Sequence, residues 1–338
     1  MTIKDVAEYS GVSVSSVSRV LNDHPDVSDQ VRARVLEAVQ ALHYVPNNSA
    51  RDLSRAQTDA IGVIVRGAGN PFFTPIIHAV EKEILQAGYS MEIHQISADE
   101  DELAAGASLA RAKRLKGMIL LGGEFDYTPD KVAVLNIPFV CCSYTNSFGT
   151  LDKNTYSSVS IDDEAEAYRA VRYLTDRGHR KIAILLGAVD DRSISELRYK
   201  GYCRALQEAG IPEDPSLVEE IDYYDMHVAY EGIQRLLERR QDLTAIFAVA
   251  DTMGVAALKA LHDAGRQVPE DCSVISIDGL PMSNFTIPTL TTLEQPKDEL
   301  AVEAVSRLIR VLEGKGKNGH LYLQTSLREG GSVGPCHR

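Results

Sequence analysis

The sequence lacks the apolar segments that would carry a chain into or across a membrane. No window offers the roughly 18 uninterrupted apolar residues that a membrane-spanning helix needs. Residues 1–30 carry charges throughout and contain no apolar stretch of the kind a signal peptide requires. We therefore expect a protein that is neither membrane-spanning nor secreted by that route.

Cysteine is also scarce. The five cysteines are odd in number, Cys141 and Cys142 are adjacent, and no spacing matches a zinc site or a disulfide framework. The reduced thiols of a cytosolic protein fit this usage best, so we expect a cytoplasmic location and no bound metal or cofactor.

The motifs of common enzymes are missing as well. The run Gly67-Ala68-Gly69 follows a strand-like segment but has no third glycine, so the dinucleotide-binding fingerprint fails. Residues 330–334 match the pattern of a nucleophile elbow, but only four residues follow them and no helix can form there. There is no His-Glu-x-x-His motif and no phosphate-loop lysine. The sequence therefore argues against an enzyme.

Positive charge is in deficit. Lys and Arg number 35 against 48 for Asp and Glu, a formal net charge of −13, which argues against nonspecific binding of polyanions by the chain as a whole. Residues 1–57 hold six basic and seven acidic residues, a net charge of −1, so they lack the basic footprint of most DNA-binding domains. Any DNA contact must depend on where these charges lie.

From Asp59 onward the sequence alternates β-rich runs with stretches of helical periodicity. The length of 338 residues favours two or three domains, and the alternation predicts an α/β fold of parallel sheets. The strand-like runs are 60–65, 90–96, 117–121, 138–142, 181–186, 244–249 and 273–277.

These runs are too many for one comfortable sheet, and a polar stretch from Tyr144 to Ser160 divides them. We expect one lobe from about 59–157 and 290–317, and a second from about 158–289 and 318–338. Ligands of open α/β sheets lie at the carboxyl ends of the strands, so two facing lobes would hold a small molecule in the cleft between them.

Residues 1–45 contain no strand-like run and predict three short helices. Their apolar stripes are Ile3, Val6 and Ala7; Val17, Val20 and Leu21; and Val31, Val35, Ala38, Val39 and Leu42. Gly11 lies where a helix-turn-helix needs its tight turn, and Ser28 suits the N-cap of the third helix. Residues 46–58 have a helix-start signal without a full apolar face, so this linker should fold only against a partner.

The polar side of the second helix carries small hydroxyls and Arg19, which could meet phosphates and base edges. The alternative is equally compatible with the spacing: the serines cap helix starts, and Arg19 is merely solvated.

Several motifs resemble the lactose and galactose repressor (LacI/GalR) family, and together they span essentially the whole chain. They are Thr2-Ile3-Lys4-Asp5-Val6-Ala7, Gly11-Val12-Ser13, Val17-Ser18-Arg19-Val20-Leu21-Asn22, Tyr44-Val45-Pro46-Asn47, Ala50-Arg51-Asp52-Leu53, Asn70-Pro71-Phe72-Phe73, Ile287-Pro288-Thr289-Leu290-Thr291-Thr292 and Gln295-Pro296.

The resemblance implies a homodimeric transcription regulator, most often a repressor, whose helix-turn-helix enters the major groove of a near-palindromic operator. It implies base contacts from Val14, Ser15 and Arg19. It implies phosphate contacts from Thr2, Ser13, Ser16, Ser18, Asn22 and Ser28. In the linker it implies a hinge helix that places Asn47, Ala50 and Leu53 in the minor groove. Asp52, beside Leu53, departs from the family pattern, because DNA phosphates would repel its carboxylate.

The resemblance also implies a two-lobed core like that of periplasmic binding proteins, with the effector site between the two lobes. The implied contacts are Phe72, Phe73, Tyr144, Arg192, Arg198, Tyr224, Asp251 and Asp278. Aromatic faces stack on sugar rings, and a carboxylate can accept from two hydroxyls, so the effector is expected to be a carbohydrate. The pair of arginines leaves a phosphorylated or carboxylated sugar open.

The sequence leaves other questions open. It fixes neither the identity of the effector nor whether the effector releases or tightens DNA. The tail after Leu327 is short and lacks a leucine heptad, so a dimer is expected. A solute-binding protein of the same two-lobed fold is the alternative, but it should have a signal peptide and no helix-turn-helix.

Overall fold

The computed structural model describes residues 2–21, 24, 26–42, 44, 58–67, 69–222 and 224–336. The chain divides into two compact units, residues 1–58 and residues 59–338. The division coincides with the end of the predicted linker.

The first unit is a small helical domain built on the three predicted apolar stripes. Its helices are α1 (Ile3–Ser10), α2 (Val14–Leu21) and α3 (Asp29–Ala41). Gly11 ends α1 in the left-handed conformation (φ 64°), which glycine adopts without steric cost, so the turn into α2 is tight. Ser28 is the N-cap residue of α3. The three stripes meet in one core, so the predicted helix-turn-helix is confirmed.

The second unit contains two six-stranded sheets. In the first sheet the strand order is β11-β5-β4-β3-β1-β2, and in the second it is β12-β10-β9-β8-β6-β7. All pairings are parallel except that of β12 with β10. The strands are β1 (Ala60–Arg66), β2 (Ser90–Ile96), β3 (Gly117–Leu121), β4 (Phe139–Cys142), β5 (Ser157–Ile161), β6 (Ile182–Leu186), β7 (Val218–Glu220), β8 (Ala245–Ala248), β9 (Ser273–Asp278), β10 (Thr291–Glu294), β11 (His320–Leu323) and β12 (Ser326–Arg328).

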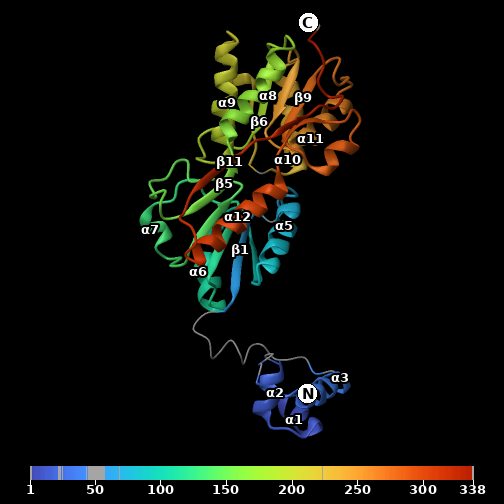
Figure 1. Ribbon diagram of the computed structural model, residues 1–338. Coiled ribbons are helices and arrows are strands. Elements are labelled where there is room, and N and C mark those ends of the chain that lie inside the picture. Colours follow the sequence, from blue (N-terminus) through green and yellow to red (C-terminus); the bar gives the residue numbers. More distant parts are fainter. Residues whose placement is uncertain are drawn as a thin grey trace. The chain divides into compact units, whose positions relative to one another are not determined.

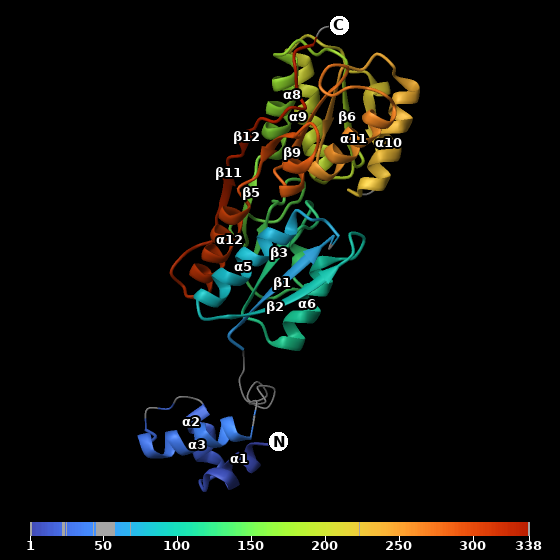
Figure 2. The same ribbon diagram turned by 90° about the vertical axis from the view of Figure 1, so that its right-hand side faces the viewer.

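Helices cover both faces of each sheet, because the parallel strands are apolar on both sides. In β1, Val63 and Val65 face one cluster and Ile64 the other. Figure 2 shows α5 beside α12, with α6 elsewhere on the first sheet, and Figure 1 shows α8 beside α9 in the second lobe. The helices are α5 (Phe73–Gln86), α6 (Glu102–Lys113), α7 (Pro129–Val132), α8 (Asp163–Thr175), α9 (Ile194–Glu208), α10 (Met226–Arg239), α11 (Asp251–Asp263) and α12 (Lys297–Leu312), with 3-10 turns at Pro215–Leu217 and Pro281–Phe285.

The predicted boundaries between the lobes need correction. Strands β5 and β11 pair with each other in the first sheet, although residues 158–161 and 318–323 were expected in the second lobe. Strand β10 pairs with β9 in the second sheet, although residues 290–294 were expected in the first. The cause is that the chain crosses between the lobes after β5, after β10 and after β11. The local sequence pattern predicts strands but does not indicate which sheet each strand joins.

No helix in the described part of the chain combines the length and apolar character needed to cross a membrane.

Candidate functional site

The residues predicted to read DNA bases lie on the outer face of α2. Val14, Ser15 and Arg19 are exposed, whereas Val17 and Val20, on the opposite side of the same helix, are buried in the small core. Val14 is a large apolar side chain at 41% exposure, with no core to cover it. The helix therefore presents a short mixed surface of one apolar group, small hydroxyls and a guanidinium, which suits contact with base edges.

The residues predicted to contact phosphates gather at the beginnings of the helices. Thr2 and Ser28 are the N-cap residues of α1 and α3, and Ser13 immediately precedes α2. The Ser13 Oγ accepts a hydrogen bond from the Ser16 backbone N–H at 3.1 Å. Ser18 is half-buried farther along α2. Helix N-termini attract anions, so this arrangement suits phosphate groups. The predicted phosphate contact Asn22 and the hinge residues Asn47, Ala50 and Leu53 lie outside the described residues.

Arg19 has an acidic neighbour. Its Nη1 lies 3.1 Å from Asp26 Oδ2, and the two side chains are 60% and 52% exposed. An ion pair this open to water contributes only about 0–1 kcal/mol. The guanidinium can therefore leave Asp26 for a base or a phosphate at small cost.

A large cleft of about 1280 Å³ separates the lobes of the second unit. Its lining comes from segments that follow the carboxyl ends of strands in both sheets, as the sequence predicted for an open α/β fold. The lining residues are 66, 67, 69, 70, 72 and 73 at the end of β1; 95–99 at the end of β2; 122–126 after β3; 143 and 144 after β4; 191–194 and 198 after β6; 222, 224 and 225 after β7; and 250, 278 and 295 at the ends of β8, β9 and β10, together with Lys131 of α7.

Seven of the eight residues predicted to bind the effector line this cleft. They are Phe72, Phe73, Tyr144, Arg192, Arg198, Tyr224 and Asp278. The eighth, Asp251, is fully buried behind the wall. Its Oδ1 accepts from the Ser276 and Thr292 hydroxyls, each at 2.6 Å, and its Oδ2 accepts from the Leu280 backbone N–H at 2.6 Å. Because both oxygens accept hydrogen bonds from the protein, Asp251 ties strand ends together, and its contact with the effector stays a prediction.

Arg198 anchors the second lobe's wall. It is 1% exposed. It donates from Nε and Nη2 to Asp163 Oδ1, at 3.0 and 2.8 Å, and from Nη1 to the Val249 carbonyl. Burial raises the pKa of Asp163 to about 6, although the guanidinium opposes that rise. Three of the five N–H donors are accounted for, so up to two remain for a molecule in the cleft.

Asp278 lies at the end of β9 in a strained backbone conformation, with φ 138°. Its carboxylate accepts from Gln295 Nε2 at 2.9 Å and from the Asp251 N–H at 3.3 Å. Burial raises its pKa to about 7, against the opposing effect of Arg198. A carboxyl that is nearly buried yet lines the cleft is suited to accept hydrogen bonds from ligand hydroxyls.

The aromatic residues differ in what they offer. Tyr144 is 1% exposed, and its hydroxyl lies 2.7 Å from that of Tyr127. Tyr224 forms a hydrogen bond between its hydroxyl and Ser195 Oγ at 2.5 Å. These hydrogen bonds hold both side chains in place at the cleft. Phe72 and Phe73 pack edge to face with ring centroids 5.6 Å apart and are mostly buried.

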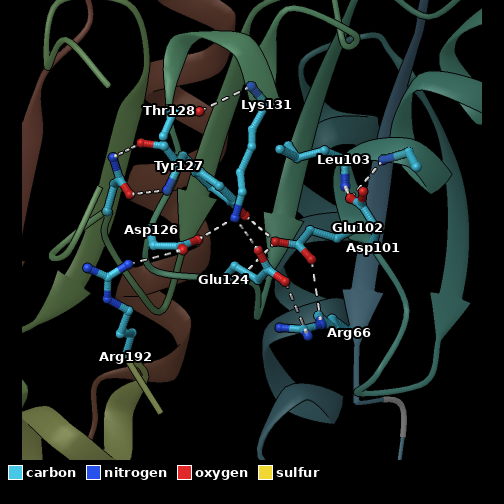
Figure 3. Close-up of polar contacts among 12 residues, drawn as sticks. Arg66, Asp101, Glu102, Leu103, Glu124, Asp126, Tyr127, Thr128, Lys131 and Arg192 are labelled. Atoms are coloured by element: carbon cyan, nitrogen blue, oxygen red, sulfur yellow. Dashed lines mark hydrogen bonds and ion pairs between the residues drawn. The ribbon is translucent and has the colours of Figure 1, made fainter. Parts of the chain in front are cut away.

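The first lobe's wall carries a charged network that the sequence did not single out. Lys131 Nζ donates to Asp126 Oδ1 at 2.7 Å and to Glu124 Oε2 at 2.9 Å, and Arg66 Nη2 lies 3.9 Å from Glu124 Oε1 (Figure 3). The bond from Lys131 holds the pKa of Asp126 below its usual range. The position of Glu124 and Asp126 just after a predicted strand was the one available signal for them.

Arg192 joins the two walls. It comes from the second lobe, in a left-handed conformation with φ 53°, and its Nη1 lies 3.7 Å from Asp126 Oδ2 of the first lobe (Figure 3). Arg192 was predicted as an effector contact, and the structure places it at the cleft with a carboxylate partner across it.

Within the described residues there is no group of three or more His, Cys, Asp or Glu side chains arranged to hold a metal ion.

A helix-turn-helix unit and a two-lobed α/β core with an interlobe cleft, joined in one chain, define the class of DNA-binding regulators that answer to a small ligand. Comparison with family models gives the same division. Residues 2–47 match the model for bacterial regulatory proteins of the lacI family, and residues 171–333 match a periplasmic binding protein-like domain.

Relatives extend the similarity over nearly the full length. The chain is 40% identical over 331 residues to the HTH-type transcriptional regulator MalR of Clostridium butyricum, covering 97% of this chain and 98% of that protein. It is 32% identical over 336 residues to the ribose operon repressor of Escherichia coli, covering 98% and 99%. A solved structure, the lac repressor dimer bound to operator and the anti-inducer ONPF, aligns with a TM-score of 0.82 at 27% identity, covering 99% of each chain. The chain therefore belongs to the LacI family of bacterial regulatory proteins.

Proposed function

We propose that this chain is a transcriptional repressor that binds an operator as a homodimer and is controlled by a sugar in the interlobe cleft. The observation that carries the proposal is the presence in one chain of an exposed helix-turn-helix surface and a ligand-sized cleft at the strand ends. The likeness to a lac repressor dimer bound to operator supports the DNA-binding role and the dimer.

The DNA contacts follow the sequence prediction. Val14, Ser15 and Arg19 would contact base edges, while the hydroxyls at the helix N-termini would position the unit on phosphates. Leu53 of the linker would enter the minor groove between the two half-sites. The net charge of the chain is −13, so specific contacts and not general attraction would hold it on DNA.

The effector would act by preferring one arrangement of the two lobes. A ligand that touches both walls of the cleft binds one closure better than another, and that preference can shift the affinity for DNA. Sugar effectors are supported by a related solved structure, a complex of the transcriptional regulator CelR with cellobiose, which aligns with a TM-score of 0.73 at 27% identity. A cytoplasmic, noncatalytic protein fits this role.

The DNA-binding part can be tested without knowing the operator. Purified full-length chain is used to select sequences from a library of random double-stranded DNA, with Arg19→Ala as the matched control. We expect enrichment of a near-palindrome by the unaltered chain and markedly less by the variant. Sequences no different from the input library would contradict the proposal. Sedimentation of the chain on the selected duplex then checks that two protomers bind.

A further inference from the structure

The cleft lining is rich in charge, and that charge is mostly negative. Four basic side chains line it among the described residues: Arg66, Lys131, Arg192 and Arg198. Seven acidic side chains line it: Asp99, Glu124, Asp126, Asp191, Asp222, Asp225 and Asp278. A phosphorylated or carboxylated ligand would therefore enter a site whose carboxylates outnumber its cations, which is unfavourable for an anion.

Each of the four cations also has a carboxylate partner. Arg66 Nε lies 3.5 Å from Glu102 Oε2, and the Arg192 and Lys131 side chains share Asp126. Arg198 is paired with Asp163. An anionic ligand would have to draw these groups away from their carboxylates. The cost is greatest at the buried Arg198 pair and smallest at Arg192 and Lys131, whose side chains are 62% and 43% exposed.

Two helix N-termini at the cleft, which could otherwise bind a phosphate, are capped by side chains of the protein. Asp225 accepts from the His227 and Val228 N–H groups at the start of α10, at 2.7 and 3.2 Å. Ser193 Oγ accepts from the Ser195 N–H at the start of α9, at 3.1 Å.

The cleft has room for a ligand larger than a single sugar ring. Its volume of about 1280 Å³ exceeds the roughly 300–1,000 Å³ of pockets that enclose drug-sized ligands. Polar groups that suit hydroxyls are present on both walls, with Asp278 and Gln295 on the second lobe and Glu124 and Asp126 on the first.

We infer that the effector is an uncharged sugar of more than one ring, and that Asp126 disfavours phosphorylated sugars by pairing with both Lys131 and Arg192. This inference rests on the proposed function, because it names the chemical class of the ligand for the same cleft. The sequence, with its pair of arginines, left a phosphorylated or carboxylated sugar open as the effector, and this inference decides in favour of an uncharged one.

The first experiment measures thermal stability and binding heat of the full-length chain. The probes are maltose, cellobiose, sucrose and maltotriose, with glucose and ribose as single rings and with glucose 6-phosphate and trehalose 6-phosphate as anions. A ligand that prefers the native state raises Tm in a dose-dependent way. We expect a rise with at least one neutral di- or trisaccharide, and dissociation constants at least about tenfold weaker for single rings and for both phosphates.

The outcomes separate the two claims. If a sugar phosphate or a single ring binds tightest, the inference is overturned while control by a sugar stands. If no sugar changes Tm, binding heat or the affinity for the selected DNA, the sugar-effector part of the proposed function fails together with the inference.

A second experiment tests the role of Asp126 directly. Asp126→Asn keeps the shape of the side chain but leaves Lys131 and Arg192 without their shared charge, so affinity for trehalose 6-phosphate should rise about tenfold relative to the unaltered chain. The control is Glu238→Gln, which makes the same change in net charge on the exposed surface of α10, away from the cleft. Equal phosphate binding by the two variants would overturn the assignment of Asp126.

Discussion

The two surfaces proposed to recognise ligands are built in opposite ways. On the helix-turn-helix, the contact residues stand in water, and Arg19 is 60% exposed. In the cleft, two contact residues of the second lobe's wall are buried in the core, with Arg198 1% and Asp278 5% exposed. Substitutions on the first surface should change binding and leave the fold alone. Substitutions of these two buried residues should change binding and stability together.

The largest effect is expected from Arg198→Ala. The substitution leaves the Asp163 carboxylate buried without its partner, and breaking a buried ion pair from one side costs about 3–5 kcal/mol. We therefore expect the free energy of unfolding to fall by that amount in urea, and the effector response to be lost.

A double-mutant cycle provides the control. With Asp163→Asn added, the combined loss should be smaller than the sum of the two single losses, because the stranded charge is gone. A loss below about 1 kcal/mol for Arg198→Ala alone would show that this wall is not held by the pair.

The contrast also explains what the sequence could predict. The helical stripes of the first unit and the seven strand-like runs follow local periodicity, and all of them appear as helices and strands. Strand β5 was missed because its serines look like loop while lying buried in the sheet. The placement of β10 and β11 depends on pairing across the lobes, which the local pattern does not contain.

The same limit applies to the cleft. Strand ends located the cleft, because the geometry of a parallel sheet is general, whereas the seven residues that line it came from the family resemblance. Asp251 follows a strand as a ligand contact would, but its neighbours take up both oxygens. Asp126 pairs with Lys131 of its own lobe and with Arg192 of the other lobe, and no spacing in the sequence predicts these pairs.

A smaller effect, confined to DNA binding, is expected from Arg19→Ala. Loss of a base contact costs about 1–3 kcal/mol of affinity for the selected operator. Stability should change by no more than about 1 kcal/mol, because the ion pair with Asp26 is exposed. Fluorescence anisotropy with a labelled duplex gives the first quantity and thermal unfolding the second. Weakened binding to operator and to unrelated DNA in equal measure would instead make Arg19 a phosphate contact.

The smallest effect is a pH dependence that belongs to the cleft alone. Burial raises the pKa of Asp278 to about 7 from an ordinary value of 3.8, so the folded state holds this proton more tightly than the unfolded state. Stability is therefore greatest when the carboxyl is protonated and falls as pH rises from about 4 to about 7. Between pH 6 and 7 the fall should be about 1 kcal/mol.

Comparison with Asp278→Asn isolates this contribution. Burial lowers the pKa of His179, which makes stability rise with pH, but that effect is present in both chains and cancels in the difference. The difference in unfolding free energy between the two chains should therefore change by about 1 kcal/mol from pH 6 to 7. A constant difference would mean that Asp278 stays ionised in the folded protein. Its carboxylate would then meet the effector as a charge, and the two walls of the cleft would be alike in this respect.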